Sequence, residues 1–196
     1  CHPPAISEQE IDAVAATLRS GWLTTGPRTA ELGARMRDYL EARHVLAVSS
    51  CTAALHLSLV ALGVGPGDEV ITTPITWPAT ANVIVHTGAT VVFADIRDDT
   101  LNIDPERVGE LVTEKTRAIV PVDLYGQPAD LGRIRSTAAK LGYHDVEVQN
   151  FGNARDVMIR LPSEKGATST QQSEQFIAAL KQDDASVVLR SSEFVG

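Results

Sequence analysis

Residues 45–73 read VLAVSSCTAALHLSLVALGVGPGDEVITT, in which apolar runs alternate with short breaks of small and polar residues. Val45–Ser49 predicts a strand, Thr52–Leu62 predicts a helix, and Glu69–Thr73 predicts a second strand after a Gly-Pro-Gly-Asp turn. Strand, helix and strand in this order form the repeating unit of an α/β fold. The stretch therefore predicts a largely parallel sheet with helices packed on both faces.

The same alternation of helices and strands continues on both sides of this stretch. Ser7 and Glu10 form a capping box at the first predicted helix, and Asp104 with Pro105 begins another. The remaining predicted elements are helices from Pro27, from about Trp77–Pro78 and over 130–142, and strands over 90–96 and 117–126. We therefore assign residues 1–140 to one α/β domain.

The first two predicted helices are amphipathic, so each should bury one face. The apolar residues that share a face are Ile11, Val14, Ala15 and Leu18 in the first helix, and Leu32, Met36 and Leu40 in the second. Gly21 is a suitable end for the first helix. The residues between the two helices, GWLTTGP, predict an irregular loop.

The pattern changes after Gly142. Residues 144–151 and 154–162 alternate apolar and polar side chains strictly, which predicts half-exposed antiparallel strands. A polar loop then leads to a predicted helix over 171–184 and a predicted strand over 186–194. We therefore expect residues 141–196 to form a small α+β unit of the order β-β-α-β, with a sheet separate from the first.

Composition argues against several classes of protein. The 196 residues carry a formal net charge of −8 with no basic stripe, which argues against nucleic acid or an anionic membrane surface as the main partner. Cys1 and Cys51 fit neither a metal-ligand spacing nor a disulfide framework, so no metal site is predicted. Two runs without charged residues, 45–67 and 71–94, are interpreted as buried elements rather than membrane spans. The chain shows no signal peptide and begins without methionine, so we expect a fragment.

The turn around Ser50 has two interpretations. A helix that begins just after a strand presents N–H groups and a positive dipole end, which together favour a phosphate. Cys51, Thr52 and Ala53 would then supply N–H groups, and Thr52 a hydroxyl as well. In the alternative interpretation, Ser50 or Thr52 only caps the helix. Spacing alone leaves both open.

A second candidate follows the strand that ends near Thr73. The segment TPITWPATAN, residues 73–82, places Trp77 on a proline-containing turn at the expected carboxyl edge of the sheet, where α/β proteins bind ligands. An indole at this place can stack on an aromatic cofactor. The alternative is that Trp77 is an ordinary core side chain.

Five segments resemble, in order and spacing, the DegT/StrS-type sugar aminotransferases. They are SGWLTTGP (20–27), residues 49–82, GATVVFADI (88–96), TLNIDPERV (100–108) and TRAIVPVDLYGQPADL (116–131). The resemblance covers residues 6–140. It implies a fold-type I enzyme that uses pyridoxal phosphate (PLP) to transfer an amino group from glutamate to a keto sugar nucleotide. It also implies a cytoplasmic homodimer.

The same resemblance implies roles for individual residues. Thr52 and Ala53 would hold the phosphate of PLP, and Trp77 would lie against its pyridine ring. The loop residues Trp22, Thr24, Thr25 and Gly26 would line the substrate side, in their own subunit or in the neighbouring subunit of the dimer. The resemblance therefore favours the phosphate interpretation of the turn.

The chain departs from the family pattern in the residues that perform catalysis. The family continues into an Asp-x-x-Gln/His motif, whose Asp keeps the ring nitrogen protonated, and later into the lysine that forms a Schiff base with PLP. Where the acidic motif belongs, this chain reads YHDVEVQNFGNARDV, and Asp123 stands where the family often has His. The lysines, none of which matches, are Lys115, Lys140, Lys165 and Lys181. We therefore assign no catalytic residue, and expect no stable Schiff base and an inactive half of an enzyme.

Residues 137–196 carry a resemblance of their own. LGYHDVEVQNFGNARDVMIRLP, QQSEQFIAALKQDD and SVVLRSSEFVG are similar to the extracytoplasmic domain of the SecF subunit of bacterial protein translocase. This resemblance implies a domain that contacts Sec translocase components and has no catalytic residue. Because the two resemblances belong to different proteins, we expect a chimeric or fused chain. The alternative function is a translocase interaction module with a non-catalytic N-terminal segment.

Overall fold

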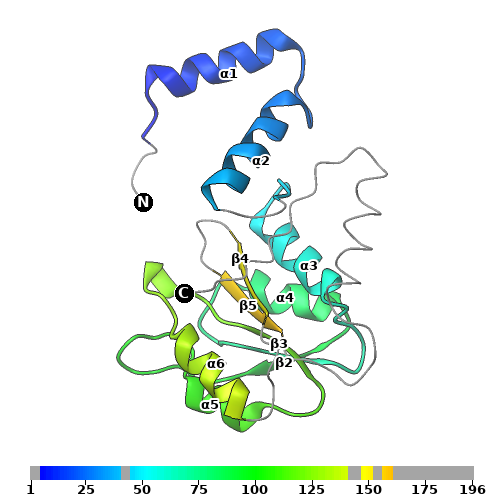
Figure 1. Ribbon diagram of the computed structural model, residues 1–196, viewed down its shortest axis with the longest axis vertical. Coiled ribbons are helices and arrows are strands. Elements are labelled where there is room, and N and C mark those ends of the chain that lie inside the picture. The colour runs from blue at the N-terminus through cyan, green and yellow to red at the C-terminus, as the bar shows by residue number, and fades with distance from the viewer. Residues whose placement is uncertain (1–4, 41–44, 141–146, 152–155, 161–196) are drawn as a thin grey trace.

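The computed structural model describes residues 5–40, 45–140, 147–151 and 156–160 of the chain (Figure 1). Its strands are β1 (Glu69–Thr72), β2 (Thr90–Phe93), β3 (Thr116–Val120), β4 (Glu147–Phe151) and β5 (Asp156–Arg160). Its helices are α1 (Glu8–Ser20), α2 (Pro27–Tyr39), α3 (Cys51–Ala61), α4 (Ala79–His86), α5 (Pro105–Leu111) and α6 (Leu131–Lys140), with a 3₁₀ turn η1 (Leu124–Gly126). Most helices and strands that the sequence predicts between residues 7 and 140 are thus present. The strand at 45–49 is absent, and the strand predicted over 117–126 ends at Val120, before η1.

The strands form one sheet in the order β2-β1-β3-β5-β4, in which β1 is parallel to β2 and to β3. α4 connects β1 to β2, and α5 leads back from β2 to β3. Because parallel crossovers are right-handed, connections in opposite directions place their helices on opposite faces. α3 packs beside α4, and α6 packs beside α5 (Figure 1). This three-layer arrangement confirms the predicted α/β fold.

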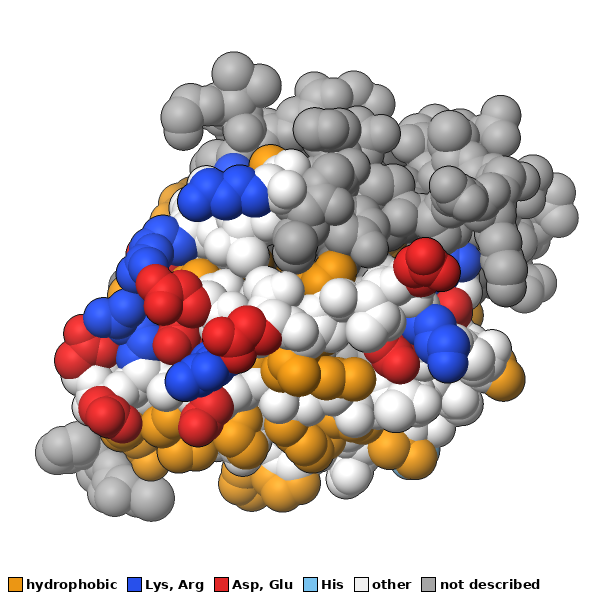
Figure 2. Space-filling model, turned by 90° about the horizontal axis from the view of Figure 1, so that it is seen from below, with side chains coloured by type: hydrophobic (Ala, Val, Ile, Leu, Met, Phe, Trp, Pro, Cys, Tyr) orange, Lys and Arg blue, Asp and Glu red, His pale blue; other side chains and the backbone are white. Residues whose placement is uncertain are grey.

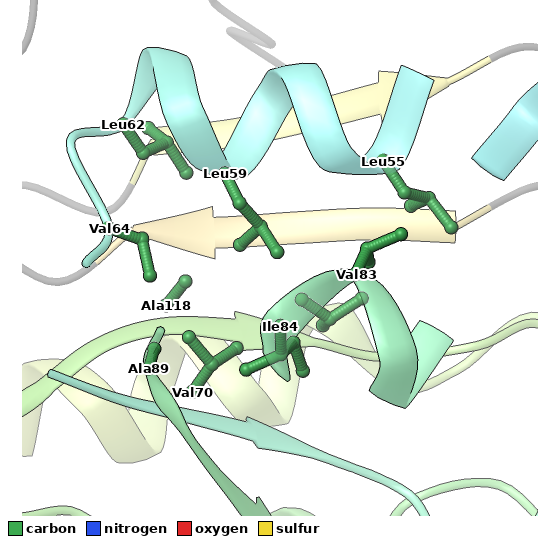
Figure 3. Close-up of a cluster of buried hydrophobic side chains, with 10 residues drawn as sticks. Leu55, Leu59, Leu62, Val64, Val70, Val83, Ile84, Ala89 and Ala118 are labelled. Carbon is green, nitrogen blue, oxygen red and sulfur yellow. The ribbon is translucent and has the colours of Figure 1, made fainter. Parts of the chain in front are cut away.

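Alternating residues of the strands divide the core into two clusters. Val70 of β1 and Ala118 of β3 pack with α3 and α4, whereas the next residues, Ile71 and Ile119, pack with α5 and α6. Figure 3 shows the first cluster, in which the side chains of α3 meet those of β1 and α4: Leu55, Leu59 and Leu62 with Val70, Val83 and Ile84. The two clusters fix helices on both faces of the sheet.

The Gly-Pro-Gly-Asp turn in front of β1 is organised by Asp68. Its carboxylate accepts hydrogen bonds from the Gly65 N–H at 3.0 Å and from Arg117 Nε of β3 at 3.1 Å. Both charged side chains are largely buried, at 16% exposed for Arg117 and 18% for Asp68. Gly67 has φ of 91°, a conformation that glycine adopts without strain. The turn therefore holds the start of β1 against β3.

α1 and α2 form as predicted but bury none of their residues. The Ser7–Glu10 capping box is present, and the hydrogen bonds from Ser7 lower the pKa of the Glu10 carboxyl below its ordinary value. The predicted apolar face of α1 is nevertheless open, with Ile11, Val14 and Leu18 at 50%, 61% and 61% exposed. The two helices lie together at one end of the molecule (Figure 1). No described element covers the apolar face of α1.

The predicted strand Val45–Ser49 is wrong, because these residues form no strand in the structure. A strand exists only where a neighbour accepts and donates its backbone hydrogen bonds. Within the described part of the chain, no strand pairs with this segment. The segment instead follows an irregular path into α3.

The expectation of a separate C-terminal sheet is also wrong for the two strands described there. β4 and β5 are antiparallel to each other, as predicted, but β5 also pairs with β3, with Ile159 opposite Ile119. β5 is therefore an interior strand of the first sheet. Without it, β3 would be an edge strand whose free N–H and C=O groups readily take up another strand. The predicted helix over 171–184 and the strand over 186–194 lie outside the described residues.

The outer surface of α5 and α6 carries charges of both signs. Arg133 of α6 pairs with Glu106 of α5 at 2.7 Å, and Arg107 pairs with Glu110 at 2.8 Å. Figure 2 shows acidic and basic side chains intermixed on the face seen from below, beside a band of hydrophobic side chains. None of the helices described is both long and apolar enough to cross a membrane.

Candidate functional site

α3 begins at the turn for which the sequence leaves two interpretations. The Ser50 hydroxyl accepts a hydrogen bond from the Ala53 N–H at 3.1 Å, and the Ser50 backbone is extended with φ −162° and ψ 160°, as at an N-cap. Ser50 is therefore the capping residue. Ala53, which the sequence predicts as a phosphate donor, already has a partner for its N–H group.

Thr52 lies in the first turn of α3 and is exposed. The first N–H groups of a helix have no acceptor within that helix, and they form the positive end of its dipole. Because Ser50 caps α3, the Thr52 hydroxyl is not needed for capping. The start of α3 therefore offers an amide, a hydroxyl and a dipole end to an anion.

Trp77 lies in the turn between β1 and α4, and 79% of it is exposed. The alternative interpretation, a core tryptophan, is therefore wrong. Hydrogen bonds hold the turn: the Ile75 N–H donates to Thr73 Oγ1 at 3.3 Å, and the hydroxyls of Thr76 and Thr80 share a hydrogen bond at 3.0 Å. Trp77 is thus an accessible aromatic surface on a turn of defined shape.

The starts of α3 and α4 lie at the same edge of the sheet. Figure 3 shows the arrowheads of β1 and β3 pointing toward the end of α3 that carries Leu55, and away from Leu62 and Val64. β1 leads at its carboxyl end into the turn with Trp77. Ligands of open α/β sheets bind outside the carboxyl ends of the strands. Thr52 and Trp77 therefore both lie at the edge where such ligands bind.

The predicted substrate loop, Trp22–Gly26, connects α1 to α2. Trp22 folds against Gly26, where an added Cβ would lie 3.2 Å from Trp22 Cε3, so the contact favours glycine. Thr24 and Thr25 are exposed. Among the residues that the structure describes, no hydrogen bond or ring contact joins this loop to Thr52 or Trp77.

A segment that follows β3 at the same edge is not among the predicted site residues. The buried side chain of Asn102 holds it, since Oδ1 accepts from the Leu124 N–H at 3.0 Å and Nδ2 donates to the Gln127 carbonyl at 2.9 Å. Between them, Tyr125 is 96% exposed and has φ of 52°. A non-glycine residue in this conformation is uncommon, and such residues cluster at functional sites. The sequence signal that could have indicated this segment is Asn102, a polar residue between the apolar residues Leu101 and Ile103.

The described lysines lie away from Thr52 and Trp77, and Asp123, which stands where the family often has His, holds the backbone. Lys115 and Lys140 are exposed, at the amino end of β3 and at the last residue of α6. The Asp123 carboxylate accepts from the Ala129 N–H at 2.8 Å and so fixes the chain before α6. In the described residues, no group of three or more His, Cys, Asp and Glu side chains could hold a metal ion.

Most of the chain is similar to proteins of one known family. The model of the DegT/DnrJ/EryC1/StrS aminotransferase family matches residues 4–147. The spore coat polysaccharide biosynthesis protein SpsC of Bacillus subtilis is 49% identical over 144 residues, which are 74% of this chain and 37% of SpsC. The match ends before most of the residues that resemble SecF, so it does not test that resemblance.

Two solved structures share the fold. Spr1654 of Streptococcus pneumoniae, named a sugar aminotransferase and determined in its PLP form, has a TM-score of 0.70 at 31% identity, over 89% of this chain and 56% of that chain. 3-Amino-5-hydroxybenzoic acid synthase has a TM-score of 0.69 at 26% identity, over 92% of this chain and 53% of that chain. This chain thus spans between about one third and just over half of the length of these proteins. With a family match over residues 4–147, the chain belongs to the DegT/DnrJ/EryC1/StrS aminotransferase family.

Proposed function

We propose that this chain is part of a PLP-dependent aminotransferase that transfers an amino group from glutamate to a keto sugar nucleotide, as a homodimer in the cytoplasm. The observation that carries the proposal is the exposed Thr52 at the start of α3, free of the capping role, at the same sheet edge as the exposed Trp77. SpsC is named for polysaccharide biosynthesis, which supports a sugar substrate. The synthase named for an aromatic amino acid is less similar, at 26% identity.

The residues at this edge fit the two ends of PLP. The hydroxyl and amide of Thr52, together with the dipole of the 11-residue helix α3, suit the phosphate. The accessible indole of Trp77 suits the pyridine ring. The Ala53 amide joins the phosphate donors only when the Ser50 hydroxyl turns away from it. We further propose that Trp22, Thr24, Thr25 and Gly26 contact the substrate.

These residues bind and orient rather than transfer protons. When bound, PLP supplies an electron-withdrawing ring that stabilises a carbanion of the substrate. Thr52 holds the phosphate at the helix start, and Trp77 covers one face of the ring and excludes water from it. The sequence predicts neither the family's ring-nitrogen Asp nor its Schiff-base lysine in this chain. We therefore propose that this chain by itself binds the cofactor without catalysing the reaction.

Thr52→Ala tests the phosphate assignment. We expect it to weaken the binding of PLP and of inorganic phosphate by about 10- to 100-fold, because a hydrogen bond to a charged group contributes about 1.5–3 kcal/mol. The free energy of unfolding should not fall, because Ser50 caps α3. Isothermal titration calorimetry measures both dissociation constants, and urea unfolding measures the stability.

Ser50→Ala is the matched control at the same turn. It should lower the free energy of unfolding by about 0.5–2 kcal/mol through loss of the cap, and it should weaken PLP binding less than Thr52→Ala does. Thr52→Ser keeps the hydroxyl and should retain the affinity. Lower stability in Thr52→Ala with both dissociation constants unchanged would show that the phosphate binds elsewhere.

Trp77→Ala separates the ring from the phosphate. We expect the dissociation constant for PLP to rise by about 2- to 10-fold, since aromatic stacking contributes about 0.5–1.5 kcal/mol. Inorganic phosphate has no ring, so its binding should not change. Tyr39→Ala, which removes an exposed aromatic side chain of α2 outside the proposed site, is the matched control and should leave PLP binding unchanged. Equal loss in both variants, by calorimetry, contradicts the stacking role.

The translocase resemblance of residues 137–196 stays a prediction, as does the contact with Sec translocase components and the extracytoplasmic placement of this part. The domain boundary at residue 140 also stays a prediction. In its favour, the family match ends at residue 147. Against an independent unit, β5 pairs with β3 of the first sheet.

A further inference from the structure

The side chains of His56 and His86 meet between α3 and α4. Their ring centroids lie 6.0 Å apart, and the planes of the rings form an angle of 80°. His56 is half-buried and His86 is exposed. The two helices pack against each other through the buried residues Leu55, Leu59 and Val83. The imidazoles are therefore held near each other by a fixed pair of helices, with one side open to water.

Neither histidine has a role in the proposed cofactor site. His86 is the last residue of α4, whereas Trp77 precedes its first residue. His56 lies one helical turn after Thr52 in α3. No hydrogen bond of either imidazole is described in the structure. Their ring nitrogens are thus not engaged by other described protein groups.

The separation of the rings suits one shared ion. A metal–nitrogen bond of about 2.0–2.1 Å places each ring centroid about 3.2 Å from the ion, so two rings on one ion have centroids at most about 6.4 Å apart. A tetrahedral angle at the ion brings them to about 5.2 Å. The observed 6.0 Å lies between these values. The rings meet edge to face in the structure, so the exposed His86 side chain has to rotate to turn a ring nitrogen toward the shared ion.

We propose that His56 and His86 chelate one divalent transition-metal ion, which clamps α3 against α4. Imidazole nitrogens bind Zn²⁺, Ni²⁺ and Cu²⁺, whereas Mg²⁺ and Ca²⁺ prefer oxygen ligands. Because the described residues contain no group of three or more potential ligand side chains, water completes the coordination. The ion thereby joins the two helices whose starts carry Thr52 and Trp77. The site uses neither of those residues, so it stands independently of the proposed function.

Thermal unfolding of the full chain with Zn²⁺ or Ni²⁺ tests the clamp. Each ion should raise the Tm, because a ligand that binds the folded state stabilises it, and Mg²⁺ should not. His56→Ala, His86→Ala and the double variant should each weaken Zn²⁺ binding by at least about 10-fold, since removing either ligand destroys the chelate. His144→Ala, which removes one of the other histidines, is the matched control and should keep the response.

The pattern of the losses decides the outcome. If the two single variants and the double variant lose Zn²⁺ affinity to the same extent, the two histidines share one ion. Losses that add, or a wild-type Tm that Zn²⁺ does not raise, overturn the proposal. Should a substitution impair folding, the wild-type chain still gives an answer: substoichiometric Cu²⁺ should broaden the NMR signals of His56 and His86 together. Broadening of one alone, or of all five histidines alike, overturns it as well.

Discussion

Leu59→Ala should lower the free energy of unfolding by about 2–5 kcal/mol, the range for truncating a buried leucine in a packed core. Leu59 is 0% exposed and lies in the cluster between α3 and β1 (Figure 3). The substitution leaves a cavity between helix and sheet, because α3 is also held by its neighbours Leu55 and Leu62 and cannot collapse fully. Urea unfolding measures the change.

Val60→Ala is the matched control for this prediction. Val60 is the next residue of α3 and is 41% exposed, so its truncation should change the free energy of unfolding by less than about 0.5 kcal/mol. The difference between the two variants reports which face of α3 is packed. Similar losses at both positions would mean that α3 does not lie on the sheet as Figure 3 shows.

Signals within a few residues were enough to predict most elements between residues 7 and 140. The cap of α5 is an example, since the Asp104 carboxylate accepts from the Glu106 N–H at 2.9 Å as the Asp-Pro-Glu sequence indicates. The division of the core into two clusters could also be predicted from neighbouring residues alone. Neighbouring strand residues such as Val70 and Ile71 point to opposite faces, so a strand that is apolar at both must carry helices on both sides.

Features that depend on a distant partner could not be predicted in this way. Val45–Ser49 has the composition of a strand, but no described strand pairs with it. The alternation in β5 predicted an antiparallel strand correctly, but alternation does not specify which strand lies beside it, and β3 does. The apolar stripe of α1 likewise predicted a helix without indicating what covers it.

The sequence predicts which types of residue form the candidate site, but it does not predict the role of each residue. A hydroxyl-rich turn before a helix indicates an anion site or a cap, and both Ser50 and Thr52 can supply the oxygen. The extended backbone of Ser50 shows that Ser50, and not Thr52, is the capping residue. That backbone geometry cannot be predicted from a run of two serines, a cysteine and a threonine. Tyr125 was missed because its left-handed conformation depends on hydrogen bonds that Leu124 and Gln127 make with Asn102, a residue distant in sequence.

Incubation with PLP followed by borohydride reduction should attach PLP to no single lysine of this chain in a one-to-one ratio. The Lys115 carbonyl accepts from the Glu69 N–H at 2.8 Å, so Lys115 lies at the amino ends of the strands, whereas Trp77 follows their carboxyl ends. The four residues of β1 separate the two edges by about 10 Å or more along the sheet. Lys140 ends α6, on the face of the sheet opposite α3 and α4.

Peptide mass spectrometry after reduction measures the labelling, and a complete PLP-dependent aminotransferase serves as the positive control. Low labelling spread over several lysines is the expected background, because exposed amines react with the PLP aldehyde without a binding site. Calorimetry on the unreduced sample shows whether PLP is bound without a covalent bond, so weak labelling is not confused with absent binding. Thr52→Ala should lower that non-covalent binding and leave the labelling pattern as it is, since the phosphate contact and the lysine are separate requirements. One lysine labelled stoichiometrically, Lys165 and Lys181 included, would contradict the prediction, because the chain would then hold the covalent anchor that its family pattern does not show.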